Sequence, residues 1–159
     1  MMAVLALVQP ILAGGKKDDK LSISLHMETE STDDPKMMFR QEINGQTRYF
    51  KRTPEISHKD IVAFSPFPSD VTEEYGVVFK LKGSATNRLA VFTNLNQGRW
   101  MVIQVNGRMV DSLIIDRPVN DGLVVVWKGI KLSDMEIFDK SMPRIGEKKG
   151  DKKKTEKKK

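Results

Sequence analysis

The sequence predicts an α+β fold, in which an antiparallel or mixed β-sheet carries two to three short helices packed on one face, preceded by an N-terminal strand and a β-hairpin. Three observations predict this class. Several short runs alternate apolar and polar residues, which is typical of half-buried strands. The pairs Asn44-Gly45 and Asn106-Gly107 each separate two such runs, and this pair is the strongest short signal for a tight hairpin. Apolar residues at helical spacing occur near residues 85–92 and 133–138.

The two ends of the 159-residue chain differ in composition from its middle. Residues 1–15 (MMAVLALVQPILAGG) are apolar and end in small residues, which is typical of a secretory signal peptide, although no basic residue precedes them; the alternative is a buried first strand or helix. Residues 148–159 have no apolar residue to bury. We therefore predict a signal peptide at 1–15, an N-terminal strand and hairpin segment at 16–56, an α+β domain at 57–146 and a disordered lysine-rich tail at 147–159.

The predicted signal peptide indicates a periplasmic or secreted protein, with a cytoplasmic protein as the alternative interpretation. The apolar run is shorter than the roughly 20 residues that a bilayer-spanning helix needs, so we expect no transmembrane span in the mature chain. The sequence has no cysteine, which excludes disulfide bonds and thiol chemistry.

The N-terminal segment is predicted to contain only β-structure. Residues 21–29 (LSISLHMET) alternate apolar and polar side chains, which indicates a first strand. Residues 37–52 flank Asn44-Gly45 and are predicted to form a hairpin, because both central residues of such a turn adopt a positive φ. His26 is expected to point to the face of the first strand opposite its apolar residues, toward solvent.

The domain that begins at Ser57 is predicted to run helix, strand, helix, strand, strand, strand, helix. Ser57 can cap a helix over residues 58–64 (HKDIVAF), which ends before Pro66. Residues 75–82 alternate as a strand, and Ser84 begins a helix whose apolar residues recur at helical spacing.

The second half of this domain is more regular. Residues 100–105 and 108–115 flank Asn106-Gly107 and predict another hairpin. Residues 123–127 (LVVVW) form a continuous apolar run, which is typical of a strand covered on both faces. Ser133 begins a last short helix.

The sequence has no recognisable catalytic equipment, and we expect a protein that is not an enzyme. Its two histidines, His26 and His58, lack the paired spacing of a zinc site, and it has no nucleophile elbow or phosphate-binding glycine loop. We therefore predict no catalytic, cofactor-binding or metal-binding residues and no cofactor. No motif identifies the residues of a binding site.

The net charge of the chain is concentrated in the tail. Eight lysines, Asp151 and Glu156 give residues 148–159 the whole formal net charge of +6, which leaves 19 basic and 19 acidic groups for residues 1–147. A neutral folded part does not favour nucleic-acid binding, because such domains carry a basic face. The tail is predicted to make weak contacts with anionic surfaces, or to act only as a solubilising segment.

Two further patterns have both a structural and a binding interpretation. The nine methionines are scattered over the predicted elements, which favours filling of core gaps over an adaptable apolar surface. Residues 48–52 (RYFKR) place two aromatic side chains among basic ones on the first hairpin, a pattern that occurs where nucleobases stack.

Five stretches from residue 53 onward match a known family in residue type and in spacing. They are Ile56-Ser57-His58-Lys59-Asp60-Ile61, Val77-Val78-Phe79-Lys80-Leu81, residues 83–93 (GSATNRLAVFT), residues 98–108 (GRWMVIQVNGR), and Pro118-Val119-Asn120-Asp121-Gly122 with Gly129-Ile130-Lys131-Leu132-Ser133. Through these stretches the chain resembles the head of the first periplasmic domain of the SecD and SecDF protein-export proteins.

The resemblance implies an α+β head outside the membrane that touches an emerging preprotein. The sequence departs from the family at residues 111–114 (DSLI), where the family has a small residue and proline, and it lacks the family's transmembrane helices. We therefore predict a non-enzymatic exported binding or structural module that contacts protein or extended peptide, by strand addition to a sheet edge. The alternative is a small structural or assembly protein that its basic tail attaches to an anionic surface such as lipid, polymer or nucleic acid.

Overall fold

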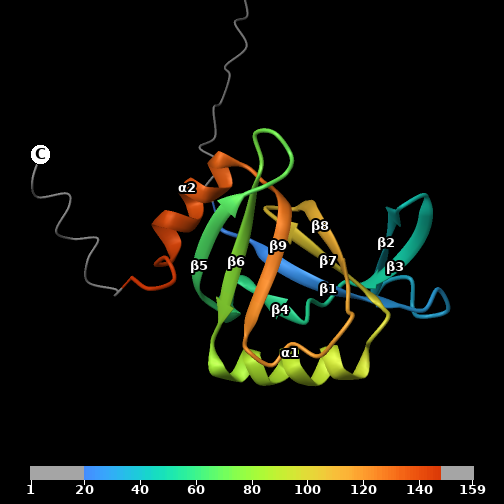
Figure 1. Cartoon of the computed structure of the whole chain (residues 1–159). Coiled ribbons are helices and arrows are strands. Elements are labelled where there is room, and N and C mark those ends of the chain that lie inside the picture. The colour runs from blue at the N-terminus through green and yellow to red at the C-terminus, as the bar shows by residue number, and fades with distance from the viewer. Residues whose placement is uncertain (1–19, 148–159) are drawn as a thin grey trace, which may run out of the picture.

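The computed structural model describes residues 20–147, and Figure 1 shows their arrangement. The predicted signal peptide at 1–15 and residues 148–159 of the predicted tail lie outside this range. The elements in chain order are β1 (Ile23–Thr29), β2 (Met38–Ile43), β3 (Gln46–Lys51), β4 (Ile56–Ser57), the 3-10 helix η1 (His58–Asp60), β5 (Ile61–Pro68), β6 (Tyr75–Leu81), α1 (Gly83–Leu95), β7 (Trp100–Val105), β8 (Arg108–Ile114), β9 (Leu123–Ile130) and α2 (Leu132–Ser141).

The strands form two sheets. The larger sheet has the order β2-β3-β1-β7-β8, with β4 paired to β1, and the smaller sheet has the order β5-β6-β9. The ladders between these strands are antiparallel. This arrangement confirms the predicted α+β class and divides the expected sheet into two parts.

Both Asn-Gly pairs form the predicted hairpin turns. Asn44 and Gly45 have φ angles of 51° and 74°, and Asn106 and Gly107 have φ angles of 51° and 76°. Positive φ at both central residues defines the type I′ turn, whose twist matches that of the flanking strands. The first turn joins β2 to β3, and the second joins β7 to β8.

β1 lies in the middle of the larger sheet. One of its sides pairs with β7, and the other pairs with β3 and β4. Ile23, Leu25 and Met27 of β1 are no more than 2% exposed and belong to the main core. The N-terminal segment therefore shares its core with the rest of the described chain, while the domain limits 16–56 and 57–146 stay a prediction.

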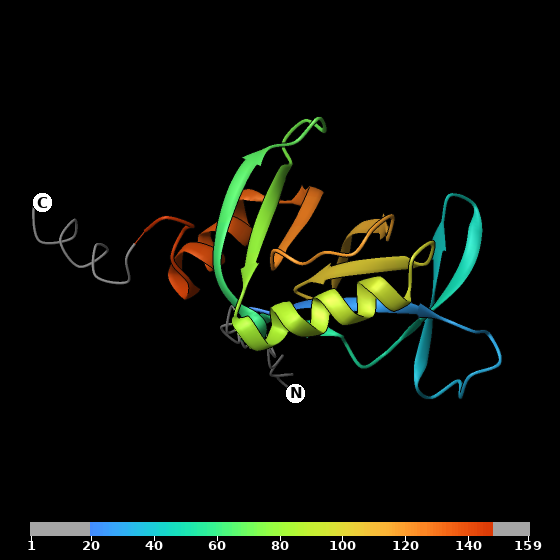
Figure 2. The ribbon, with the colours of Figure 1, turned by 60° about the horizontal axis from the view of Figure 1, so that its bottom comes forward.

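The main core lies between the two sheets, and α1 crosses from one sheet to the other (Figure 2). α1 buries the apolar residues that helical spacing predicted, and α2 buries Met135 and Phe138. The Phe138 ring meets the rings of Phe64 and Phe79 edge-on, at centroid distances of 5.6 Å. Burial of each such side chain contributes about 1.5–3 kcal/mol relative to an exposed position.

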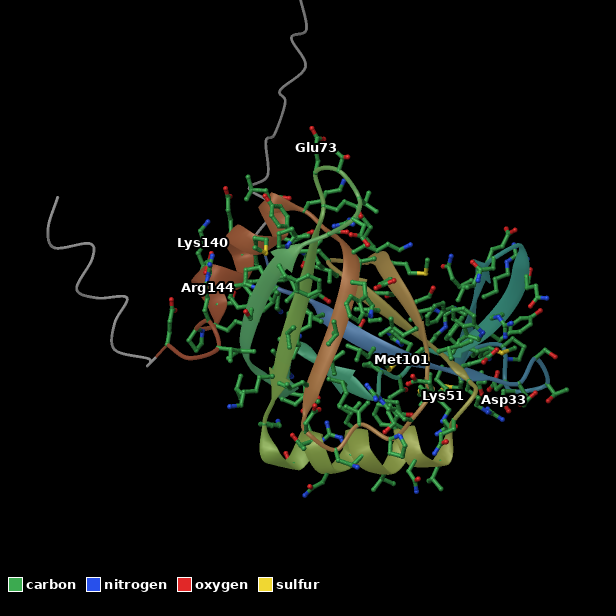
Figure 3. All side chains as sticks on the ribbon, viewed as in Figure 1. Asp33, Lys51, Glu73, Met101, Lys140 and Arg144 are labelled. Atoms are coloured by element: carbon green, nitrogen blue, oxygen red, sulfur yellow. The ribbon has the colours of Figure 1, made fainter. Side chains whose placement is uncertain are left out.

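The methionines fill the core only in part. Met101 is 5% exposed and lies between the two sheets, near the middle of the molecule (Figure 3). Met27, Met38, Met135 and Met142 are also buried, as predicted for gap-filling residues. Met37 and Met109 are exposed instead.

The helix predicted over residues 58–64 is wrong. Only His58–Asp60 form a 3-10 turn, and the chain continues directly as β5, which pairs with β6. The β-branched Ile61 and Val62 favour a strand over a helix at this point. β5 is an edge strand, where Pro66 and Pro68 are tolerated because one side of the backbone needs no ladder partner.

Asp60 joins this turn to the start of α1. Its carboxylate accepts a hydrogen bond from the Ser57 N–H at 3.0 Å and forms ion pairs with Lys82 at 3.1 Å and Arg88 at 2.9 Å. Burial opposes ionisation of the Asp60 carboxyl, but the hydrogen bonds and positive charges outweigh burial and lower its pKa to about 2.

His26 is buried, so the expectation that it faces solvent is wrong. Alternation along β1 does turn it away from the main core, but the β2–β3 hairpin covers this face and leaves His26 5% exposed. Its Nδ1 donates to the Lys51 carbonyl at 2.8 Å, its Nε2 accepts from the Ser24 hydroxyl at 2.8 Å, and its ring meets Phe39 edge-on. Burial lowers the pKa of His26, and the bond to Lys51 opposes this effect only in part.

Candidate functional site

A groove lies between the edges of the two sheets. β8 is the edge of the larger sheet and β9 is an edge of the smaller one, and the two strands diverge toward the loop of residues 115–122 (Figure 1). The space between them is a cavity of about 680 Å³. Residues of β8, β9 and this loop line the cavity, together with Met101 of β7 and with Leu89 and Thr93 of α1.

Asp111 closes the narrow end of the groove. Its Oδ2 accepts a hydrogen bond from the Trp127 N–H of β9 at 2.8 Å, and its Oδ1 accepts one from the Ser112 N–H of β8 at 2.9 Å. The carboxylate is buried, because Asp111 is 5% exposed. Asp111 follows a bulge at Val110.

The loop of residues 115–122 closes the wide end. Thr93 of α1 anchors it, because the Thr93 hydroxyl accepts a hydrogen bond from the Val119 N–H at 3.0 Å and donates one to the Leu89 carbonyl at 2.6 Å. The Asp121 carboxylate accepts a hydrogen bond from the Leu123 N–H at 3.0 Å, where the loop enters β9. The groove is therefore bounded at both ends by fixed groups.

The backbone of β9 presents unpaired groups to the groove. The Gly122 carbonyl accepts a hydrogen bond from the Leu81 N–H of β6 at 2.9 Å. Alternate residues of a strand direct their backbone groups to the same side, so those of Leu123, Val125 and Trp127 face the groove. Within the described residues, neither the N–H nor the carbonyl of Val125 has a partner.

The edge of β8 offers fewer such groups. The Ile115 N–H donates to the Arg99 carbonyl at 3.0 Å, on the side of β7. By the same alternation, Ser112 and Ile114 direct their backbone groups toward the groove. The Ser112 N–H already has Asp111 as its partner, which leaves Ile114 as the unpaired donor of β8.

The walls of the groove are apolar. Leu113 and Ile114 come from β8, and Leu123, Val125 and Trp127 come from β9. The prediction that the LVVVW run is covered on both faces is wrong: Val124 and Val126 are buried, whereas Trp127 on the other face is 60% exposed. No described element packs over that face, although Phe67 of β5 meets the Trp127 ring edge-on at 5.9 Å.

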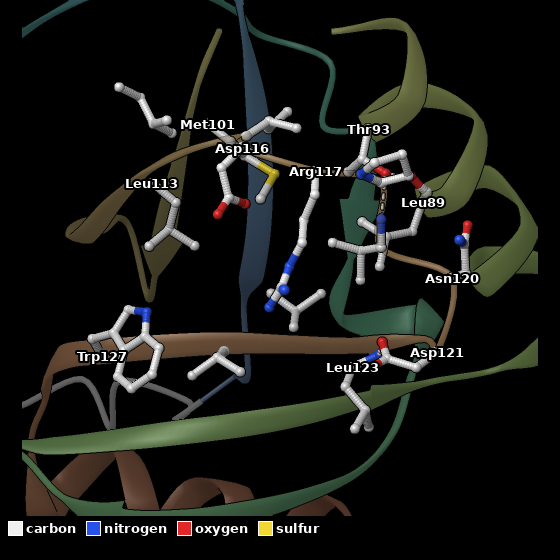
Figure 4. A pocket seen from close by; sticks show the side chains of 16 residues that line it. Leu89, Thr93, Met101, Leu113, Asp116, Arg117, Asn120, Asp121, Leu123 and Trp127 are labelled. Atoms are coloured by element: carbon white, nitrogen blue, oxygen red, sulfur yellow. Dashed lines mark hydrogen bonds between the residues drawn. The ribbon is translucent and has the colours of Figure 1, made fainter. Parts of the chain in front are cut away.

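Charged residues lie at the loop end of the groove. Asp116, Arg117 and Asp121 all belong to the loop that crosses the wide end and are exposed. Figure 4 shows the Arg117 side chain extending from the loop into the space above β9. The groove therefore combines apolar walls with charged groups of the loop, of which Arg117 reaches in among the walls.

Two members of the cluster at residues 48–52 are used within the fold. Phe50 is completely buried, and with Ile43 and Val102 it forms a second, smaller core beneath the β2–β3 hairpin. Arg48 forms an ion pair with Glu28 at 2.7 Å and lies over the Trp100 ring, 5.2 Å from its centroid. Tyr49 is half-buried, and Lys51 and Arg52 are exposed.

Sequence reasoning did not identify the groove residues. His26 and His58, the residues weighed as ligands, do not line the cavity. Among residues 20–147, no three His, Cys, Asp or Glu side chains lie together as a metal ion requires. The one available signal was the LVVVW run, because a strand that is apolar on both faces needs contact on both, and the structure leaves one face open.

Comparison with known proteins identifies the fold. No family model matches the sequence, and none of the curated proteins matches it. Two solved structures of SecDF are similar. One, described as a membrane component that enhances protein export, has a TM-score of 0.53 at 12% identity and covers 76% of this chain and 61% of that chain. The other, SecDF in a super-membrane-facing form, has a TM-score of 0.50 at 14% identity and covers 72% of this chain and 17% of that chain.

The present chain thus spans about three fifths of one SecDF chain and about a sixth of the other. Neither helix in the described part, residues 20–147, is long and apolar enough to cross a membrane. The described residues have a SecDF head-like fold.

Proposed function

We propose that this chain is a non-enzymatic, exported module that binds protein or peptide in an extended conformation, in the groove between β8 and β9. The observation that carries the proposal is the combination of apolar walls with unpaired backbone groups on two sheet edges. An unpaired edge is a template for another strand, and a polypeptide backbone has the matching donors and acceptors.

The side chains of the groove favour the same occupant. Trp127 and Ile114 are 60% and 51% exposed, so an apolar segment between them removes a large apolar area from water. Each apolar Å² removed contributes roughly 25 cal/mol. An unfolded segment offers such side chains, whereas a folded protein has buried most of them.

Two observations support export of the module. The similar structures belong to a membrane component that enhances protein export, and this chain spans only part of them. Residues 1–15 have the composition of a signal peptide. A periplasmic or secreted location brings the groove to polypeptides that have left the membrane.

Fluorescence anisotropy tests the binding site. The probe is a fluorescein-labelled peptide with a central Val-Leu-Val-Leu-Val segment flanked by serine and lysine. Ile114→Glu places a charge on the groove wall and is expected to weaken binding about tenfold, because the charge loses water when the peptide binds. The matched control is Leu95→Glu on α1, where the leucine is 75% exposed and does not line the groove.

Leu95→Glu is expected to bind the peptide within about twofold of the unchanged protein, as is usual for an exposed position away from the site. Equal affinities of the two variants would place the binding elsewhere. Absence of binding by the unchanged protein would overturn the proposed function.

A further inference from the structure

We infer that the bound segment adds as a strand to β9 rather than to β8, and that Val125 supplies the hydrogen-bonding N–H and carbonyl. This inference rests on the proposed function and specifies the register in which the bound segment pairs.

β9 has a regular edge with a free donor and acceptor at its centre. Its pairing with β6 is continuous from Val126 to Leu123, so its opposite edge is straight over this stretch. β8 pairs regularly with β7 from Asp111 to Ile114, but a bulge at Val110 ends this stretch and the Ser112 N–H is already bound by the Asp111 carboxylate. A regular edge is needed for a ladder, because each bulge shifts the register by one residue.

Two aspartates determine where an added strand can pair with β9. The Asp111 carboxylate accepts a hydrogen bond from the Trp127 N–H, and the Asp121 carboxylate accepts one from the Leu123 N–H. Of the three residues that face the groove, Val125 is thus the one that keeps both its donor and its acceptor unpaired. An added strand makes its pair of main-chain hydrogen bonds there, at the centre of the groove.

The side chains around Val125 specify what the segment contains. Successive residues of the added strand point to opposite faces. One set of its side chains lies beside Leu123 and Trp127, and the other set points toward Met101 and Leu113. Both environments are apolar apart from Arg117, whose side chain extends from the loop into the space above β9. The site therefore selects a segment of about five residues that is mainly apolar on both faces and contains no proline opposite Val125.

Proline substitution tests the edge directly. Val125→Pro removes the N–H that faces the groove, and proline is tolerated there because this N–H is not part of the ladder to β6. Val125→Ala is its matched control, since it also shortens the side chain and keeps the N–H. With the same fluorescein-labelled peptide, Val125→Pro is expected to bind about tenfold more weakly than Val125→Ala, from the loss of one hydrogen bond and the partner left unpaired.

The pair Ile114→Pro and Ile114→Ala makes the same comparison on β8. These two variants are expected to have equal dissociation constants within about twofold. A larger effect of proline at Ile114 than at Val125 would assign the strand to β8 and overturn the inference. Equal affinities within both pairs would mean that side chains alone hold the peptide, which also overturns the inference but leaves the proposed function intact.

The ligand provides a test that does not depend on the folding of a proline variant. N-methylation of each backbone nitrogen of the peptide in turn, measured on the unchanged protein, is expected to weaken binding about tenfold at the residue opposite Val125 and little at its two neighbours. This period of two distinguishes a paired strand from an apolar contact. A uniform effect along the peptide would overturn the inference.

Discussion

Single residues of the described chain determine where its strand edges are available. Both oxygens of the Asp111 carboxylate accept backbone N–H groups, one from each of the strands that border the groove. A buried carboxylate is stable only when such partners compensate for the water it has lost. Asp111 therefore holds β8 and β9 at a fixed separation, at a point where they have no ladder between them.

Asp111→Ala is expected to lower the free energy of unfolding by about 2–3 kcal/mol, because it leaves two N–H groups without a partner in a buried position. Urea unfolding followed by circular dichroism measures this. Asp116→Ala is the matched control, since Asp116 is an exposed carboxylate five residues further along, and its loss is expected to cost less than about 0.5 kcal/mol. Similar losses for both variants would contradict the role of Asp111.

The lowered pKa of His26 predicts that the stability of the protein depends on pH. Because burial lowers its pKa in the folded protein below the ordinary value of 6.5, the unfolded chain binds more protons in the interval between the two values. Stability is therefore expected to fall as the pH decreases below 6.5, and to stop falling once the pH passes the lowered pKa. Thermal unfolding between pH 7.5 and 5 measures this. His26→Gln should lose the dependence in this interval, and an unchanged slope would assign it to another group.

The secondary-structure elements were predictable where local chemistry decides them. Asn44-Gly45 and Asn106-Gly107 require a positive φ, and only tight turns provide it, so both hairpins could be placed from the sequence. Residues 58–64 could not be assigned correctly, because a real turn, which the Asp60 carboxylate closes on the Ser57 N–H, precedes a segment that pairs with β6 as a strand. Pairing between distant residues overrode the local signal.

The charge of Asp60 stabilises the junction between the 3-10 turn η1 and the start of α1. Its pKa of about 2 lies below the ordinary value of 3.8, so its contribution is present above pH 3.8 and is lost as the pH falls through 2. Asp60→Asn is expected to cost about 1–2 kcal/mol at pH 7 and less than about 0.5 kcal/mol near pH 2, where the folded carboxyl is half protonated. Urea unfolding at both pH values measures the difference. An equal cost at both would mean that packing, and not charge, is responsible.

At the scale of the molecule, the fold class followed from the sequence and the site did not. The walls of the groove come from β8, β9 and α1, and no local pattern states that these elements converge. The burial of His26 has the same origin, since the hairpin that covers it lies more than ten residues further along the chain. Alternation shows which side chains share a face, but not what covers that face.

The lysine tail at 147–159 stays a prediction, and its removal separates the two functional hypotheses. Truncation after Gly146 is expected to leave the affinity for the apolar peptide unchanged within about twofold. It should abolish binding to phosphatidylserine vesicles at low salt, because the removed residues carry a formal charge of +5 out of the net +6. Cosedimentation with the vesicles and anisotropy with the peptide measure the two effects. Loss of peptide binding on truncation would favour attachment through the tail as the main function.

The position of Val125 between two sheets has a consequence for the kind of polypeptide that can reach it. An edge at the outside of a protein also attracts the edges of folded neighbours, and such contacts lead to aggregation. The outer edge at β5 carries two prolines, whereas the edge at β9 lies in a recess bounded by β8, α1 and a loop. The strand edge of a folded protein is kept from β9 by steric contact with these walls. The shape of the recess therefore admits unfolded chains and excludes folded proteins.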